Sequence, residues 1–165
     1  HLHHIHRGVF NHPKLQVLCE DGLSFITKNT GTFYHIVLDL PDPVGPAEQL
    51  YEDIFLLNCK KRLSPNGTLN IHTGSPWAHP ERVRNSFQRL SGIFQNVTLW
   101  TVFIPLYGTL WSMCVCSGLT RLDTVCSDEI DHRLKNRGIL DLQYYSGLTH
   151  TSLIALPPFI DQMIR

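Results

Sequence analysis

The chain has 165 residues, of which 42% are hydrophobic and 17% are charged, a balance that fits one globular domain with a substantial core and excludes intrinsic disorder. The 14 Lys and Arg residues equal the 14 Asp and Glu residues, so the formal net charge is zero and no basic field points to a nucleic acid partner. The longest apolar runs, such as residues 99–106, are too short to span a bilayer, and no signal peptide opens the chain, so we expect no membrane partner.

Cysteine and histidine usage bears on compartment and metal binding. The five cysteines are odd in number and lack the CxxC spacing of a zinc site, which favours reduced thiols in a cytoplasmic protein. Five histidines lie in the first twelve residues, but no acidic residue or cysteine stands near to complete a ligand set, so we predict no metal site. These are His1, His3, His4, His6 and His12.

The first predicted elements come before residue 40. Residues 14–19 alternate in a β-rich pattern and predict a strand, which the acidic turn at 20–22 ends before a short helix over 23–28. Residues 34–39 are a near-continuous apolar run of strand length. That pattern predicts a central parallel strand covered on both faces.

Two helices and a strand are expected in the middle of the chain. The first helix runs from Glu48, and the Ser-Pro-Asn-Gly segment at 64–67 ends it before a strand at 68–72. Pro80 suits the first turn of the second helix, over 79–94. The apolar residues at helical spacing in the first helix are Leu50, Ile54, Leu57 and Leu63.

The last third of the chain predicts a hairpin followed by helices. Residues 97–104 and 110–116 are β-rich runs joined by a short corner, so they must pair antiparallel. Ser127 is a suitable N-cap for a helix that Gly138 ends, and short helices follow at 149–156 and after the prolines at 157–158. The inner face of the helix that Ser127 begins is marked by Ile130 and Leu134.

Alternating strands and helices that end in an antiparallel hairpin predict an α/β fold, a Rossmann-like doubly wound sheet. Such sheets usually open with a strand, a glycine-rich turn and a helix, yet the sequence contains no GxGxxG or GxGxG. We therefore interpret residues 1–165 as a single partial Rossmann-like domain, incomplete at its N-terminal side.

Polar side chains gather where predicted strands end, the edge at which open α/β sheets bind ligands. The loop at 39–47 holds three prolines and one glycine in nine residues, so its backbone is rigid around Asp39 and Asp42. A solvated loop whose aspartates cap the next helix is the alternative interpretation. Rigidity at the end of a buried strand favours a site for a cationic substrate, whose ammonium group two carboxylates can bind and deprotonate.

The segment Asp-x-x-Asp-Pro-x-Gly-Pro-Ala-x-x-Leu-Tyr, at residues 39–51, closely resembles the active-site segment of the polyamine aminopropyltransferases, the spermidine and spermine synthase family. Weaker resemblances follow the same order along the whole chain. They are Arg-Gly-Val-Phe at 7–10 with Glu-Asp-Gly at 20–22, Gly-Ser-Pro at 74–76 with His-Pro-Glu at 79–81, Pro-Leu-Tyr-Gly at 105–108, and residues 142–157.

For the amine, the resemblance implies that Asp39 is the base or amine-orienting carboxylate and that Asp42 binds the cationic end of the polyamine. Tyr107 would line the amine channel. His72 stands in place of a glutamine of the family, and we assign it to substrate binding together with Asp42 and Tyr107.

For the nucleoside, the resemblance implies that Asp21, beside Gly22, hydrogen-bonds the adenine amino group. Pro46, Ala47 and Leu50 would pack on the nucleoside of decarboxylated S-adenosylmethionine. The implied reaction transfers the aminopropyl group of that co-substrate to a polyamine such as putrescine and releases methylthioadenosine, with no metal or other cofactor.

Some features of the family are absent from this sequence. The glycine-rich loop and the N-terminal β-domain are missing, and Leu40 and Pro41 replace small hydroxyl residues, which leaves the acceptor amine open. Two alternatives stay open beside the aminopropyltransferase: a small-molecule methyltransferase on the same fold, and a non-catalytic scaffold or dimerisation unit. We also expect a homo-oligomer, because half of a sheet exposes a strand edge.

Overall fold

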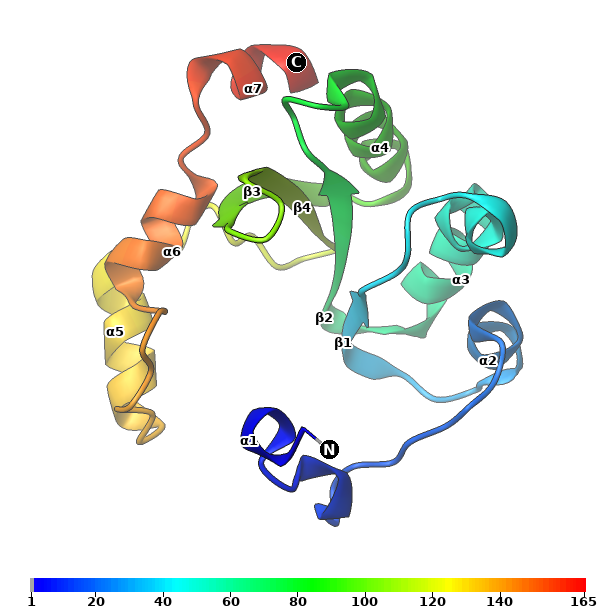
Figure 1. Cartoon of the computed structure of the whole chain (residues 1–165), viewed down its shortest axis with the longest axis horizontal. Coiled ribbons are helices and arrows are strands. Elements are labelled where there is room, and N and C mark those ends of the chain that lie inside the picture. The colour runs from blue at the N-terminus through cyan, green and yellow to red at the C-terminus, as the bar shows by residue number, and fades with distance from the viewer. Residues whose placement is uncertain (1) are drawn as a thin grey trace.

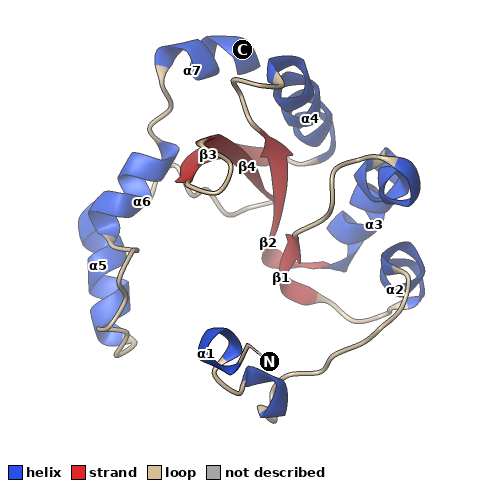
Figure 2. Ribbon diagram, viewed as in Figure 1, coloured by secondary structure: helices blue, strands red, loops and turns tan. Residues whose placement is uncertain are grey.

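The computed structural model describes residues 2–165, and His1 lies outside them. A four-stranded sheet with the order β1-β2-β4-β3 forms its centre (Figures 1 and 2). Strand β1 (Phe33–Leu38) pairs parallel with β2 (Leu63–Gly74), which pairs antiparallel with β4 (Thr109–Ser117). Strand β3 (Asn96–Ile104) pairs antiparallel with β4. The predicted α/β fold with a terminal antiparallel hairpin is therefore confirmed.

Helices lie on both faces of the sheet (Figure 1). One face carries α2 (Gly22–Lys28), α3 (Asp53–Arg62) and α4 (Pro80–Ile93). The other face carries α5 (Ser127–Asn136) and α6 (Gly147–Ile154), and α7 (Pro158–Ile164) packs against α4. The remaining short helical segments are α1 (His3–His6) and the 3-10 helices η1 (Val9–Asn11) and η2 (Gly45–Tyr51). No helix within residues 2–165 is long and apolar enough to cross a membrane.

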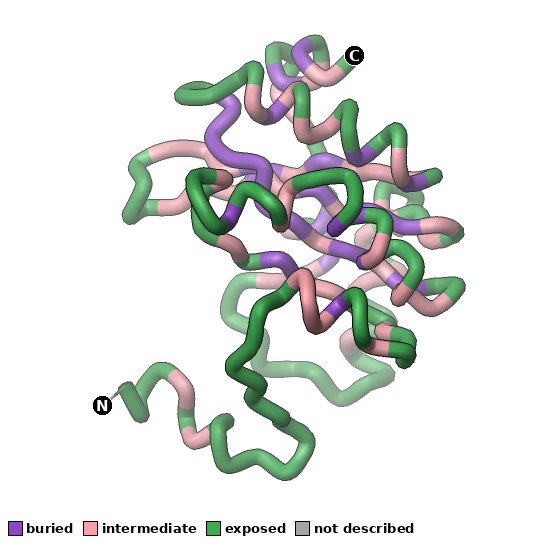
Figure 3. Tube along the Cα trace, turned by 90° about the vertical axis from the view of Figure 1, so that its right-hand side faces the viewer, coloured by how far each residue is buried: buried purple, intermediate pink, exposed green. Residues whose placement is uncertain are grey.

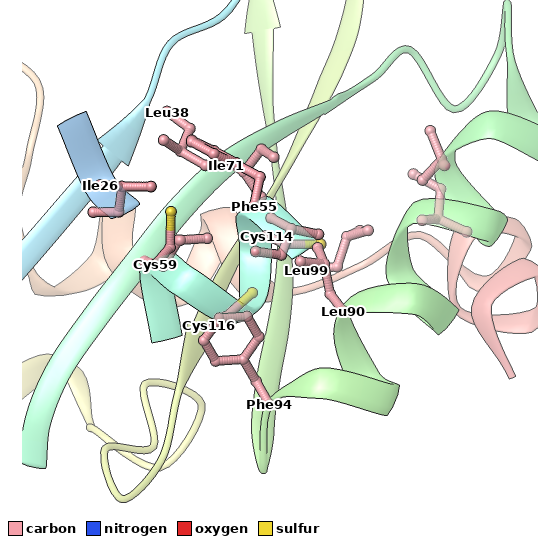
Figure 4. Packing of buried hydrophobic residues seen from close by; sticks show 14 of the residues in the cluster. Ile26, Leu38, Phe55, Cys59, Ile71, Leu90, Phe94, Leu99, Cys114 and Cys116 are labelled. Carbon is pink, nitrogen blue, oxygen red and sulfur yellow. The ribbon is translucent and has the colours of Figure 1, made fainter. Parts of the chain in front are cut away.

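The core lies between the sheet and the helices α3 and α4 (Figure 4). Strand alternation turns Leu69 and Ile71 of β2 to this side, and the register places Cys116 and Cys114 of β4 beside them. Helix α4 contributes Val83 and Leu90, which lie seven positions apart and therefore on the same face of the helix. They are 0% and 2% exposed. Cys114 and Cys116 are therefore interior residues, and both are 0% exposed.

The N-terminal segment differs from the prediction. Residues 2–20 form an arm that is almost wholly exposed (Figure 3), and the expected strand at 14–19 is not formed. A strand needs a neighbour for its backbone groups, and this segment pairs with no part of residues 2–165. Because residues 14–19 form no strand beside it, β1 has only β2 as a neighbour and is an edge strand. It is not the doubly covered central strand that its apolar run predicts, and its Tyr34 and Val37 are 83% and 56% exposed.

The helix expected from Glu48 forms as two separate elements, and the prediction of which residues face the core was wrong. The backbone is extended at Glu52, so η2 ends and α3 begins with a new helical phase. The helix consequently exposes Ile54 and Leu57 and buries Phe55, Leu56 and Cys59 instead. The Ser-Pro-Asn-Gly segment ends α3 as predicted, but it lies inside β2, where the pairing with β1 shifts register between Phe33 and His35.

Elements with strong local signals match their predictions closely. The helix over 23–28, helix α4, the β3–β4 hairpin and the last two helices all form, with ends within a few residues of those expected. The N-cap of α5 is Cys126 and not Ser127, which is already helical. The inner face of α5 is only half-buried at Ile130 and Leu134, while Gly138 takes a φ of +67° just after the helix, as a C-terminal stop requires.

Candidate functional site

Two parallel strands end at the same edge of the sheet and bring two loops together there. The loop at 39–44 follows β1, and the last residues of β2, from His72 to Gly74, lie next to it. Both segments change direction sharply at this edge. The prolines of the loop at 39–44 fix its backbone, and Gly74 at the end of β2 adopts a φ of +107°.

Three donors hold three successive residues of the loop at 39–44. His72 Nε2 donates to the Leu40 carbonyl oxygen at 2.6 Å, because a carbonyl can only accept. Tyr51 Oη donates to the Pro41 carbonyl oxygen at 2.7 Å. Arg82 Nη1 donates to Asp42 Oδ1 at 2.8 Å. We call this arrangement the loop clamp; its donors come from β2, η2 and α4.

The two ring donors of the loop clamp also contact each other. Tyr51 Oη lies 2.9 Å from His72 Nε2, and burial raises the pKa of Tyr51 to about 12, so its hydroxyl stays protonated and able to donate. His72 is 7% exposed and stacks on Trp111, with a ring-centroid distance of 6.0 Å. Its Nδ1 atom is buried and has no hydrogen-bond partner within residues 2–165.

Asp39 and Asp42 have different surroundings. The hydrogen bond from Arg82 is the main cause that lowers the pKa of Asp42. Burial acts in the opposite direction, and the charges of Arg82, His72 and His79 lower the pKa further. Asp39 is exposed, and its side chain forms no hydrogen bond or ion pair with any described residue. Of the two carboxylates, Asp42 is therefore neutralised by a protein cation and Asp39 is available to another group.

A cavity of about 510 Å³ lies on one side of the loop. We call it the aromatic cavity, because Tyr107 and Trp111 form part of its wall, with ring centroids 4.8 Å apart. Asp42 and His72 line it too, so the structure brings together three of the four residues that the resemblance assigns to the amine, and Asp39 is the exception. Its full lining is Leu40, Pro41, Asp42, His72, Ser75, Ala78, His79, Arg82, Tyr107, Thr109 and Trp111.

A second cavity, of about 310 Å³, shares Leu40 as a lining residue with the aromatic cavity. We call it the apolar cavity. Gly22 and Leu50 line it, and a Cβ atom on Gly22 would lie 3.7 Å from Leu50 Cδ2, so these two predicted nucleoside residues are in contact. Most of its other lining residues are apolar, among them Phe25, Ile26, Leu38 and Phe55.

The other predicted nucleoside residues do not line these cavities. Asp21 caps α2, since its Oδ1 accepts a hydrogen bond from the Ser24 amide at 2.8 Å. Ala47 is 8% exposed and packs into the protein, while Pro46 is exposed. Asp39 lies at the start of the loop and is absent from the lining of both cavities.

Sequence reasoning missed three residues of this site. Tyr51 stands at the end of the recognised segment, so its position was visible while its contact with Pro41 was not. Arg82 is one of several polar residues on α4, and nothing in the sequence marks its pairing with a residue 40 positions earlier. Trp111 lies within the predicted hairpin, but nothing in the sequence marks its stacking on His72.

Comparison with known proteins places this geometry in a family. Residues 1–124 match the family model described as the spermine/spermidine synthase domain. The polyamine aminopropyltransferase of Nitrosomonas europaea is 38% identical over 160 residues, which are 97% of this chain and 49% of the relative. That of Sulfolobus acidocaldarius is 28% identical over 162 residues, which are 97% of this chain and 54% of the relative.

Solved structures show the same fold. A spermidine synthase in complex with the transition state analogue AdoDATO superposes with a TM-score of 0.85 at 22% identity, covering 99% of this chain and 55% of that one. The spermidine synthase from Thermotoga maritima gives a TM-score of 0.80 at 19% identity, covering 99% and 53%. The chain thus spans about half the length of the relatives that it matches.

Proposed function

Since the chain belongs to the spermine/spermidine synthase family, we propose that it carries the acceptor side of a polyamine aminopropyltransferase active site. In this proposal the enzyme transfers the aminopropyl group of decarboxylated S-adenosylmethionine to a polyamine such as putrescine. The observation that carries the proposal is the clamped loop at 39–44, which begins with the unpaired carboxylate of Asp39 and contributes the next three residues to the lining of the aromatic cavity.

The amine is assigned to the aromatic cavity. Tyr107 and Trp111 offer ring faces to a cationic chain, and Asp42 offers a carboxylate to its far ammonium group. Asp39 orients the reacting amine and accepts the proton that the amine must lose. The neutral nitrogen then forms a bond to the carbon next to the sulfonium, the carbon–sulfur bond breaks, and its electron pair leaves with methylthioadenosine.

The nucleoside is assigned to the apolar cavity side. Gly22 and Leu50 already form one surface there, and Asp21 has a second carboxylate oxygen for an adenine amino group beyond the one that caps α2. Pro46 and Ala47, on the adjoining η2 segment, would hold this surface in place. The sulfonium is itself a good leaving group, so positioning and proton removal suffice and the proposed reaction uses no metal or further cofactor.

We extend the proposal to assembly and compartment. We propose a homo-oligomer, in the simplest case a dimer, for the chain on its own, in which the edge of β1 is unpaired and can pair with a second copy. A cytoplasmic location is supported by five cysteines that are all free thiols in the structure.

The test uses a hybrid protein, in which this chain is joined to the part of the Nitrosomonas europaea relative that it does not match. The hybrid, the chain alone and the whole relative receive decarboxylated S-adenosylmethionine and putrescine, and mass spectrometry measures the products. We expect the hybrid to release methylthioadenosine and aminopropylated amine in equal amounts. Methyl transfer from S-adenosylmethionine instead would establish the methyltransferase alternative, and a folded hybrid without either activity would establish the scaffold alternative.

A further inference from the structure

We propose that Arg82 is a specificity-determining residue of the acceptor site: its guanidinium shares Asp42 with the acceptor and so weakens the binding of the acceptor's second ammonium group. This inference rests on the proposed function, which places an amine in the aromatic cavity. It concerns how strongly that cavity distinguishes an amine with two cationic ends from an amine with one.

Arg82 is held in place and is not a mobile surface side chain. It stands in the first turns of α4, its Nη1 lies 2.8 Å from Asp42 Oδ1, and its side chain is 23% exposed, against 62% for Asp42. It also rests against the end of β2, because a Cβ atom on Gly74 would lie 3.5 Å from Arg82 Nε. The cation is thus supported from two sides while the carboxylate faces the open cavity.

The charges around the aromatic cavity make Arg82 and a bound ammonium group compete for Asp42. Among the lining residues, Asp42 is the one carboxylate and Arg82 the one residue with a permanent positive charge, with His72 and His79 close by. Asp42 Oδ2 accepts no hydrogen bond from the described residues, so an ammonium group can still bind there. That ammonium would have to share one negative charge with Arg82, and the repulsion between the two cations reduces the attraction.

The chemistry of the acceptor makes the effect selective. An amine whose far end is a methyl group places no cation at Asp42, so Arg82 does not oppose its binding. A diamine of the same length meets the full competition. We therefore expect Arg82 to affect the KM for the diamine and to leave the KM for the monoamine unchanged.

The experiment measures KM and kcat of the hybrid protein with 1,4-diaminobutane and with n-butylamine. Arg82→Gln should lower the KM for 1,4-diaminobutane about two- to fivefold, the range expected for a partly exposed ion pair, and should not change the KM for n-butylamine. Arg82→Lys keeps the positive charge and should lower the KM for 1,4-diaminobutane less than Arg82→Gln does. Arg82→Gln in an Asp42→Asn background should give no gain. Arg84→Gln, on the same helix and paired with Glu81, is the matched control and should change neither KM.

A higher KM for the diamine in Arg82→Gln would overturn the proposal, since it would show that Arg82 only holds Asp42 in position. An equal change for both amines would overturn it too. The proposed function is judged separately, by turnover of the unmodified hybrid. If that turnover is absent, the same variants are compared by calorimetric binding of the two amines, and the ratio of the two affinities still decides the role of Arg82.

Discussion

At the scale of single residues, Asp39 and Asp42 lie three positions apart but differ in what they contact. Asp42 is paired with Arg82, while Asp39 is exposed without a partner in the described chain. A proton acceptor works best when no fixed cation holds its charge, because a paired carboxylate is a weaker base. Asp39 is for this reason the stronger candidate for proton removal, and Asp42 for binding.

Replacing Asp39 by Asn should lower the kcat of the hybrid protein by about 10²- to 10⁴-fold, the loss expected when a positioned base is removed. The KM for the amine should change much less. Asp123→Asn is a suitable control, because Asp123 pairs with Arg121 on the exposed surface. A kcat within threefold of the unmodified hybrid would remove Asp39 from the chemistry.

The raised pKa of Tyr51 predicts that the stability of the chain declines at alkaline pH. Burial raises the pKa of Tyr51 to about 12, whereas a tyrosine in the unfolded chain ionises near its ordinary pKa of about 10. The unfolded state therefore loses this proton first, and the stability that Tyr51 contributes is complete below pH 10 and declines as the pH rises towards 12.

Urea unfolding at pH 8, 10 and 11 tests this contribution. The free energy of unfolding should fall more steeply with pH in the unmodified chain than in Tyr51→Phe, so the two curves should converge above pH 10. Tyr34→Phe, at an 83% exposed position, serves as the control. A constant difference between the unmodified chain and Tyr51→Phe at all three pH values would contradict the prediction.

At the scale of secondary-structure elements, helix α4 connects the core to the site. Its inner face buries Val83 and Leu90, and its first turns present Arg82 to Asp42. The packing of the helix therefore sets the position of the cation. Loss of core packing in α4 is expected to cost stability first and to loosen the loop clamp as a consequence.

Leu90→Ala should lower the free energy of unfolding by about 2–5 kcal/mol, since it removes buried methyl groups and leaves a cavity in a close-packed region. Leu148→Ala, on helix α6, removes the same atoms from a side chain that is 76% exposed and should change the free energy by less than about 0.5 kcal/mol. Urea titration of the chain measures both. Similar losses in the two variants would show that α4 is not packed as described.

The five cysteines fall into a buried group, on helix α3 and strand β4, and an exposed group. Cys59, Cys114 and Cys116 are buried, and burial raises the pKa of the thiols of Cys59 and Cys116 to about 12, while Cys19 and Cys126 are exposed. A thiol-specific reagent at pH 8 should modify Cys19 and Cys126 in the folded chain and all five cysteines after denaturation. Mass spectrometry of the labelled peptides identifies the sites, and rapid labelling of Cys114 would contradict the register of β4.

The elements that sequence predicts well are those whose signals are local. Pro80 and the apolar spacing of α4 lie within the helix that they define, and the corner at 105–108 lies within its hairpin. The strand at 14–19 and the covered position of β1 failed because pairing depends on a distant neighbour. In the site, the recognised segment predicted the aspartates, whereas the contact of Arg82 with Asp42 depends on packing between residues 40 positions apart.

At the scale of the whole molecule, one region of the sheet is uncovered. Edge strand β1 exposes Tyr34 and Val37, and a cavity of about 520 Å³ lies between the sheet and α6, lined largely by apolar side chains such as Trp100 and Leu153. An unpaired strand edge beside apolar surface favours association with another chain.

Light scattering should therefore show the isolated chain associating with itself, and Val37→Lys should shift it towards the monomer by placing a charge on the exposed side of β1. Leu119→Lys adds the same charge at a 65% exposed position away from β1 and should have no such effect. Calorimetry on the same samples should show weak or no binding of methylthioadenosine. A monodisperse monomer that binds the nucleoside at micromolar affinity would contradict this prediction.

The loop clamp has a consequence for the order in which the protein is made. Its donors Tyr51, His72 and Arg82 follow their acceptors by 10, 32 and 40 residues. During synthesis the loop at 39–44 therefore leaves the ribosome before all three elements that hold it, and the clamp is complete only when α4 has docked. Contacts of this range form late, because the intervening chain must first be brought together. A protein truncated before α4 would thus keep both aspartates but lack the cation that pairs with Asp42.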